Sequence, residues 1–181
     1  MHLSSYARMA EFVARYLDPT QTLAILDVGS MNRNGSYRPL FAHPGWTVTG
    51  MDIEPGPEVD VVVADPYHWA AFADGSFDVV ISGSTLEHIE YPWLTMQEVA
   101  RVLRPGGLTC HIAPSAGPEH RVLLDCYRYY SDGFAALAKW AGLAVLSVTT
   151  DWTPAVYADD SAQWKDSVLI AQKPLVPAAA G

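Results

Sequence analysis

The chain has 181 residues and a formal net charge of −9, from 11 Lys and Arg against 20 Asp and Glu, and 50 % of its residues are hydrophobic. This length favours one domain. The composition is typical of a packed core and argues against disorder or a coiled coil. Because no basic run offsets the acidic charge, a nucleic-acid backbone or an anionic membrane is a poor partner. We therefore expect a module that handles a small molecule.

The two cysteines, Cys110 and Cys126, are too few for a disulfide framework. The N-terminus shows no basic-then-apolar signal pattern, and no apolar run approaches the roughly 20 residues of a membrane span. These observations predict a cytoplasmic protein. They divide the chain into an N-terminal helix over 1–20, one domain over 21–174 and a flexible tail over 175–181.

The predicted elements alternate between helices and strands. Apolar residues at helical spacing predict helices, of which Pro92 is suited to begin one and Ser131 to cap another. Short apolar runs predict buried strands. In chain order we expect a helix over 6–17, strands over 22–28, 46–52, 59–64 and 77–82, a helix over 92–103, a strand over 108–113, a helix over 131–141, and strands over 143–149 and 168–173.

This alternation is typical of an α/β sheet covered on both faces. We expect a single Rossmann-like, doubly wound domain with a mostly parallel seven-stranded sheet. The last two strands lack a helix between them and predict a C-terminal antiparallel hairpin. Residues 53–58 are too few and too proline-rich for a crossover helix, so strand 59–64 is expected to be a short edge strand reached by a coil.

Polar residues follow the carboxyl ends of successive predicted strands, the edge where open α/β sheets bind ligands. Gly29 allows a tight turn and a close approach to a ligand. Asp52 lies 23 residues after Gly29 and suits two ribose hydroxyls, and Asp65 could accept from an exocyclic amine of adenine. Each has a simpler explanation: a tight turn, a solvated loop acid and an Asp65-Pro66 turn pair. Together they predict a nucleoside-bearing cofactor.

Several segments resemble the successive motifs of class I S-adenosylmethionine-dependent methyltransferases, over about residues 22–150. They are Ile25–Gly29, Gly50–Asp52, Phe77–Ile81, Leu86–His88 and Glu98 with Arg101–Gly107. The resemblance implies S-adenosylmethionine as cofactor, contacted by Asp27, Gly29 and Ser30 at its amino-acid part, Asp52 and Ile53 at its ribose, Asp65 and Pro66 at its adenine, and Ser82 and Thr85 at its methionine end.

Two departures from this family pattern concern the segments beside the expected cofactor. The family's G-x-G-x-G loop is replaced by a longer one after Gly29, in which Asn32, Asn34 and Gly35 are expected to take over the missing contacts. The usual helix between the second and third strands is also missing.

Methyl transfer needs alignment more than acid–base help, and a base is needed only for an acceptor that is still protonated at pH 7. Histidine is the natural candidate. We expect His120, in the loop after strand 108–113, to be the base, with His88 as the second candidate; His111, inside a strand, is better explained as a structural residue. No metal is expected, because Ser84 stands where some quinone-type methyltransferases carry a metal-binding acid.

The loop over 114–130 is expected to recognise the acceptor, because loops at that edge tend to carry substrate-binding groups. Its tyrosines can stack against a sugar or an aromatic ring, although an aromatic packing cluster explains each of them equally well. The expected substrate-binding residues are Ser115, Arg121, Tyr127 and Tyr129. Little chain remains for a substrate domain, so recognition falls to loops 114–130 and 150–166 or to a second subunit of a homodimer.

The resemblance favours O-methylation of a hydroxyl on a sugar or natural product. Two alternatives remain open. An NAD-dependent oxidoreductase fits the spacing of Asp27 and Asp52, although the chain lacks a G-x-G-x-x-G loop and a second domain. A non-catalytic cofactor-binding module is the other.

Overall fold

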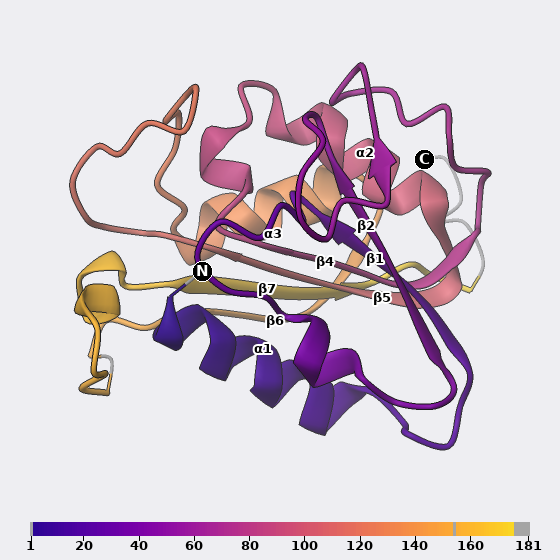
Figure 1. Cartoon of the computed structure of the whole chain (residues 1–181), viewed down its shortest axis with the longest axis horizontal. Coiled ribbons are helices and arrows are strands. Elements are labelled where there is room, and N and C mark those ends of the chain that lie inside the picture. The colour runs from indigo at the N-terminus through magenta and orange to yellow at the C-terminus, as the bar shows by residue number, and fades with distance from the viewer. Residues whose placement is uncertain (1, 154, 176–181) are drawn as a thin grey trace.

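A computed structural model describes residues 2–153 and 155–175 (Figure 1). Within them the chain forms a seven-stranded sheet in the order β3-β2-β1-β4-β5-β7-β6. Only β7 runs antiparallel to its neighbours, β5 and β6. The strands are β1 (Leu23–Val28), β2 (Trp46–Asp52), β3 (Val61–Val62), β4 (Phe77–Gly83), β5 (Leu103–Ala113), β6 (Ala144–Thr150) and β7 (Ser167–Gln172). The predicted Rossmann-like sheet with a C-terminal antiparallel hairpin is confirmed.

Helices cover both faces of this sheet. The α-helices are α1 (Leu3–Tyr16), α2 (Pro92–Val102) and α3 (Ser131–Trp140), and the short 3₁₀ helices are η1 (Arg38–Phe41), η2 (Leu86–His88) and η3 (Asp160–Trp164). In Figure 1, α1 and η1 lie on one side of the sheet, and α2 and α3 on the other. None of the described helices has the length and apolar character needed to cross a membrane.

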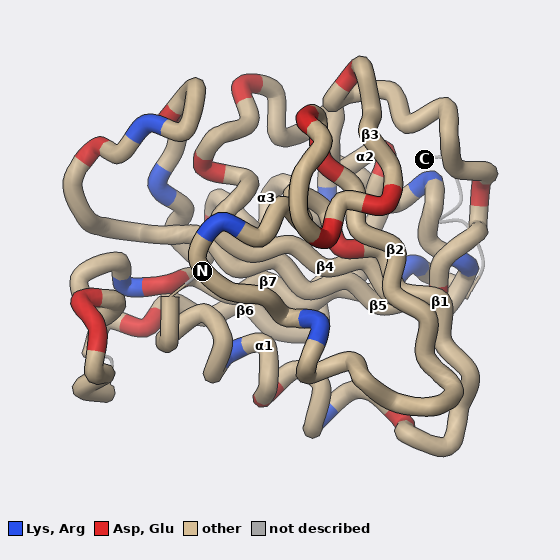
Figure 2. Tube along the Cα trace, in the orientation of Figure 1, with Lys and Arg blue, Asp and Glu red and all other residues tan. Residues whose placement is uncertain are grey.

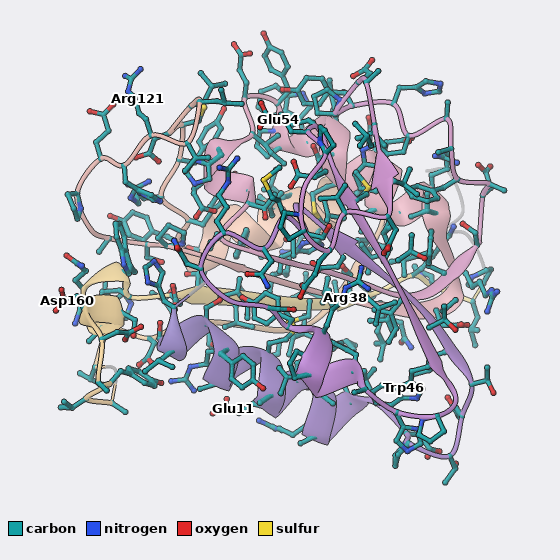
Figure 3. The ribbon with its side chains drawn as sticks, viewed as in Figure 1. Glu11, Arg38, Trp46, Glu54, Arg121 and Asp160 are labelled. Carbon is teal, nitrogen blue, oxygen red and sulfur yellow. The ribbon has the colours of Figure 1, made fainter. Side chains whose placement is uncertain are left out.

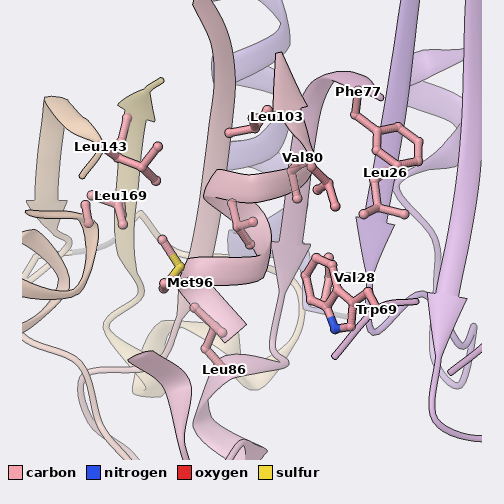
Figure 4. Packing of buried hydrophobic residues seen from close by; sticks show 14 of the residues in the cluster. Leu26, Val28, Trp69, Phe77, Val80, Leu86, Met96, Leu103, Leu143 and Leu169 are labelled. Atoms are coloured by element: carbon pink, nitrogen blue, oxygen red, sulfur yellow. The ribbon is translucent and has the colours of Figure 1, made fainter. Parts of the chain in front are cut away.

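Each face of the sheet has its own hydrophobic core, because successive strand residues point to opposite sides. Ile25 packs with α1 and η1, whereas its neighbour Leu26 packs with α2. Figure 4 shows the second core, where Leu26 and Val80 lie near the buried Trp69, and Met96 lies beside Leu86 in the same cluster. Both faces are therefore closed, and a ligand has access at the strand ends.

Three local predictions differ from the structure. The edge strand β3 has two residues rather than six, although it is reached by a coil as expected. β5 begins at Leu103, so the Arg104–Gly107 segment that was expected to end the helix belongs to a strand. Ser131 is the first residue of α3 rather than its cap: Tyr130 occupies the cap position, and the Ser131 hydroxyl lies 2.9 Å from Thr150 Oγ1 on β6. The predicted tail over 175–181 lies, apart from Leu175, outside the described residues.

The segment from Glu98 to Gly107 stabilises the fold and does not itself line the cavity. Glu98 on α2 accepts the Trp69 N–H at 2.7 Å and pairs with Arg101 at 2.7 Å. Arg101 also donates to the carbonyls of Trp69 and Phe72, at 3.1 and 2.8 Å. These bonds fasten the turns that follow β3 to α2, and they fix Trp69 at the base of the ligand cavity.

Candidate active site

A cavity of about 360 Å³ opens where β1, β2 and β4 end. This volume lies within the range of small-molecule sites. The carboxyl ends of these parallel strands meet at one edge of the sheet, so residues far apart in the sequence converge there. Nine of the residues expected to bind the cofactor line the cavity: Asp27, Gly29, Ser30, Asn34, Gly35, Asp52, Ile53, Pro66 and Thr85.

Gly29 makes the turn at the end of β1 as the sequence predicts. Its φ of +75° lies in the left-handed region, and a Cβ at this position would come within 2.3 Å of Thr85 Oγ1. The N–H groups of Gly29 and Ser30 both donate to the Met51 carbonyl on β2, at 2.9 and 3.0 Å. The turn thus brings backbone to the cavity at a place where a side chain would not fit.

Asp27 is a buried acid on the cavity wall. Burial raises the pKa of its carboxyl to about 7, with Arg38 acting in the opposite direction. Since desolvation disfavours the charged form, a cationic group in the cavity would stabilise the Asp27 carboxylate. This suits the ammonium or sulfonium of an amino-acid-like ligand.

Asp52 closes β2 with its carboxylate on the same cavity. Its Oδ2 accepts the Met31 N–H at 3.2 Å, and its Oδ1 accepts the Ile53 N–H at 2.7 Å. A carboxylate has about four acceptor positions, so these bonds orient the group and leave capacity for ligand hydroxyls.

The lengthened loop after Gly29 is tied to the coil that replaces the usual helix before β3. Asn32 accepts the Gly35 N–H at 2.9 Å and donates to Glu58 at 3.1 Å. At Gly50, a Cβ would come within 2.1 Å of the Glu58 carbonyl oxygen, so the coil lies directly on β2. Figure 2 shows acidic positions gathered where β2 and β3 end. The lengthened loop after Gly29 and the coil before β3 therefore pack against each other and form one wall of the cavity.

Asn32, Asp65 and Ser82 lie outside the cavity lining, contrary to expectation. The exposed Asp65 accepts the Tyr67 N–H at 2.8 Å, as an acid in a turn does. Ser82 is buried, with its hydroxyl 2.7 Å from His111 Nδ1. His111 is the structural residue that the sequence predicts: it is fully buried, it also contacts Thr109 Oγ1 at 2.7 Å, and burial lowers its pKa to about 3.

His88 and His120 meet at the mouth of the cavity. Their rings are 4.9 Å apart in an edge-to-face arrangement, and both line the cavity. His88 comes from η2, and its Nδ1 lies 2.6 Å from the Leu124 carbonyl oxygen. Burial lowers the pKa of His88. The structure thus brings the two candidate bases together, although the sequence offered them as separate choices.

The four expected substrate-binding residues lie outside the cavity lining. Ser115 is buried beside Ser167, with 2.7 Å between their hydroxyl oxygens. Tyr129 stacks on Phe134 at 4.5 Å and donates to the Leu86 carbonyl. The remaining two are Tyr127, which donates to the Glu90 carbonyl, and Arg121, which pairs with Glu119 and projects from the loop in Figure 3. The tyrosines therefore stabilise the loop, as the structural explanation predicts.

Other residues line the mouth without having been predicted. Val122, Leu123 and Leu124 form an apolar rim, of which Leu123 is 67 % exposed. Beside them, Glu87 is fully buried next to His88. The Leu86-Glu87-His88 motif was visible in the sequence, but nothing there indicated that the Glu87 carboxylate faces two histidines.

The comparisons with known proteins agree with this geometry. Residues 26–110 match the family described as a methyltransferase domain. This segment of the chain is therefore similar to a methyltransferase domain. The matched segment runs from β1 into β5 and includes Asp27, Gly29, Asp52 and His88, while His120 lies beyond it.

Two curated relatives are named uncharacterized methyltransferases. The one from Mycolicibacterium gilvum (strain PYR-GCK) is 29 % identical over 137 residues, which are 67 % of this chain and 51 % of the relative. The one from Mycobacterium avium (strain 104) is 32 % identical over 132 residues, 65 % of this chain and 49 % of the relative. The chain thus spans about half the length of the curated relatives it matches.

Solved structures share the fold at low sequence identity. The 1,6-didemethyltoxoflavin-N1-methyltransferase of Burkholderia thailandensis, solved with S-adenosylhomocysteine, has a TM-score of 0.70 at 18 % identity, covering 95 % of this chain and 80 % of its own. The cyclase SpnF has a TM-score of 0.69 at 16 % identity, covering 93 % and 81 %. Because a methyltransferase and a cyclase share this fold, the reaction must be argued from the site.

Proposed function

We propose that this chain is a class I methyltransferase domain, which binds S-adenosylmethionine and transfers its methyl group to the hydroxyl of a small molecule. The convergence of Asp27, Gly29 and Asp52 on one cavity carries this proposal. When bound, S-adenosylmethionine supplies an electrophilic methyl carbon on a sulfonium, which a nucleophile takes with release of the thioether.

The residues present fit this cofactor. Asp27 is a buried acid whose charge a ligand cation would stabilise. Gly29 lets the backbone approach the ligand, and Asp52 retains acceptor capacity for a pair of ribose hydroxyls. Val63, Pro66 and Trp69 supply an apolar surface on the same cavity for an adenine ring. The cavity thus offers an acid for the cationic part of the cofactor, a hydrogen-bond acceptor for its hydroxyls and an apolar surface for its aromatic ring.

For the acceptor, we propose a hydroxyl group on a sugar or natural product, placed between the cofactor and the two histidines at the mouth. His88 and His120 are the cavity-lining groups suited to activate a hydroxyl there. The apolar rim of Val122, Leu123 and Leu124 favours an acceptor that also carries an apolar part.

Calorimetry with S-adenosylmethionine, S-adenosylhomocysteine and NAD tests the proposal. We expect the first two ligands to bind with one site per chain and NAD not to bind. Binding of NAD alone would instead support an oxidoreductase. If neither adenosyl compound binds, the proposed function is wrong. Binding without methyl transfer to any supplied hydroxyl compound would support the non-catalytic cofactor-binding module.

A further inference from the structure

Glu87 is a buried acid whose carboxylate receives no hydrogen bond from another described residue. Its side chain is 1 % exposed, and both carboxylate oxygens lack such a partner. Buried polar groups in folded proteins are nearly always hydrogen-bonded, and exceptions call for an explanation. Burial raises the pKa of Glu87 to about 8, with its own backbone N–H and the charge of Arg128 acting in the opposite direction.

Two imidazoles face this carboxylate. His88 Nε2 lies 3.7 Å from Glu87 Oε1, and the His120 ring lies 4.9 Å from the His88 ring. One ligating atom from each of the three residues lies within 4.8 Å of the others. Two ligand atoms of a tetrahedral site with bonds of 2.0–2.1 Å are about 3.4 Å apart. The Glu87–His88 distance is therefore close to that of a metal site, and a ligating atom of His120 lies within 4.8 Å of both residues.

Hydrogen bonds behind His88 orient its ring for ligation. The Leu124 carbonyl oxygen, 2.6 Å from His88 Nδ1, can only accept. The proton of the neutral ring therefore sits on Nδ1, and the lone pair of Nε2 points toward Glu87. Cys126 and Tyr127 donate their N–H groups to the Glu87 carbonyl at 2.7 and 3.2 Å, which fastens the 114–130 loop to η2.

His120 is held by different contacts. Its backbone N–H donates to Asp125 Oδ2 at 2.7 Å, and its Nδ1 accepts from the Arg128 guanidinium at 3.4 Å and lies 3.7 Å from the Asp125 carboxylate. Arg128 pairs with Asp125 at 2.6 Å, and Trp164 packs against the imidazole at 4.6 Å. A carbonyl behind the second nitrogen, as at His88, is typical of metal-ligating histidines. Ligation through Nε2 of His120 requires its Nδ1 to carry the proton and to donate to Asp125 instead of accepting from Arg128.

We propose that Glu87, His88 and His120 bind a divalent transition-metal ion such as Zn²⁺ at the mouth of the cavity. Two imidazole nitrogens and one carboxylate oxygen form the ligand set of zinc sites that keep a fourth position open. Mg²⁺ and Ca²⁺ prefer oxygen ligands and suit this set less well. The sequence argued against a metal because Ser84 is not an acid, but the fold supplies the third ligand from a distant loop.

The open position of this metal would face the cavity, because both histidines line it. A hydroxyl bound there loses its proton to solvent more readily, since the cation stabilises the resulting oxyanion. His88 and His120 would then act as ligands rather than as proton acceptors. This catalytic role rests on the proposed function, whereas the metal binding itself does not.

Calorimetric titration of the metal-free full chain with Zn²⁺, without any adenosyl ligand, tests the site. We expect one ion per chain. His120→Ala and Glu87→Gln should each weaken Zn²⁺ binding by at least about 100-fold, the upper end of what even an outer-shell partner contributes. His68→Ala is the matched control: it removes an exposed histidine outside the cavity and should change the affinity less than about twofold. Co²⁺ should give the visible absorption of a low-coordinate site, and His120→Ala should remove it.

Each outcome decides the proposal. Equal Zn²⁺ affinity in the wild type and His120→Ala, or an equal loss in His68→Ala, overturns it and leaves surface binding only. His120 lies on a loop outside the helices and strands, so this variant remains informative even if Glu87→Gln does not fold. Zn²⁺ binding without S-adenosylmethionine binding overturns only the proposed function. Cofactor binding without Zn²⁺ binding overturns only the metal site.

Discussion

The two ends of the cavity are built differently. At the proposed cofactor end, Gly29 directly follows β1 and Asp52 is the last residue of β2, so the parallel register of the two strands brings both to the same end of the sheet. At the proposed acceptor end, His88 and His120 come from a 3₁₀ turn and an irregular loop that meet only in the folded chain. The first end depends on backbone shape and the second on side chains brought together by tertiary contacts. Substitutions should therefore separate cofactor binding from acceptor chemistry.

The largest loss of cofactor affinity is expected for Gly29→Ala. The added methyl would come within 2.3 Å of Thr85 Oγ1, and φ is +75°, so the β1 turn must change shape. We expect S-adenosylmethionine binding to weaken by at least about 100-fold, since strain of this kind costs on the order of 1–3 kcal/mol and contacts are lost as well. Calorimetry measures the effect.

Gly133→Ala is the matched control, because a Cβ there meets nothing within 4 Å and the residue lies in α3. It should leave cofactor affinity unchanged and stabilise the helix by about 0.5–1 kcal/mol. If both variants lose binding equally, the argument from the shape of the β1 turn is wrong.

Asp52→Ala is expected to have the next largest effect. Removing the carboxylate takes away the proposed ribose contact and the bond to the Met31 N–H. We expect a weakening of about 10- to 100-fold, the range of hydrogen bonds to a charged group. Asp65→Ala removes an acid that lies outside the cavity and should change the affinity less than about twofold. Equal losses would instead return Asp65 to the adenine site.

A pH dependence should follow from Asp27, whose pKa burial raises to about 7. A cationic ligand favours the ionised carboxyl, so binding below pH 7 must release a proton. The affinity for S-adenosylhomocysteine should rise about tenfold from pH 6 to pH 8. Titration in two buffers of different ionisation enthalpy counts the proton, and Asp27→Asn should remove the dependence. A flat profile in the wild type would contradict the role of Asp27.

The same acid should affect the stability of the ligand-free protein. The folded pKa of about 7 exceeds the ordinary 3.8, so the folded state holds this proton more tightly than the unfolded state. The contribution of Asp27 to the free energy of unfolding is therefore largest below about pH 3.8 and is lost as the pH rises to 7. Urea unfolding at pH 5 and pH 8 should show a smaller difference for Asp27→Asn than for the wild type.

The positions of Gly29 and Asp52 on the cavity were predictable because the period of a strand and its register determine where its last residue lies. Gly29 and Asp52 follow from that rule, and Asp65 fails it because β3 stops at Val62 and a turn intervenes. At the proposed acceptor end, the tyrosines of the 114–130 loop show what could not be predicted from the sequence. Whether Tyr129 faces a substrate or Phe134 depends on packing between distant elements, which no local pattern in the sequence records.

The sharpest test of the division between the two ends is His120→Ala, for which we expect the smallest effect on cofactor affinity among the substitutions of cavity-lining residues. His120 lies in the loop after β5, in contact with His88 and Trp164 rather than with the β1 turn or Asp52. The affinity for S-adenosylhomocysteine should therefore change less than about twofold, within the additivity expected of separated sites. Calorimetry on the metal-free protein measures this change in ligand affinity without any contribution from metal binding. If His120→Ala weakens the ligand as much as Asp52→Ala does, the two ends form one coupled site, and the 114–130 loop must close over the cofactor itself.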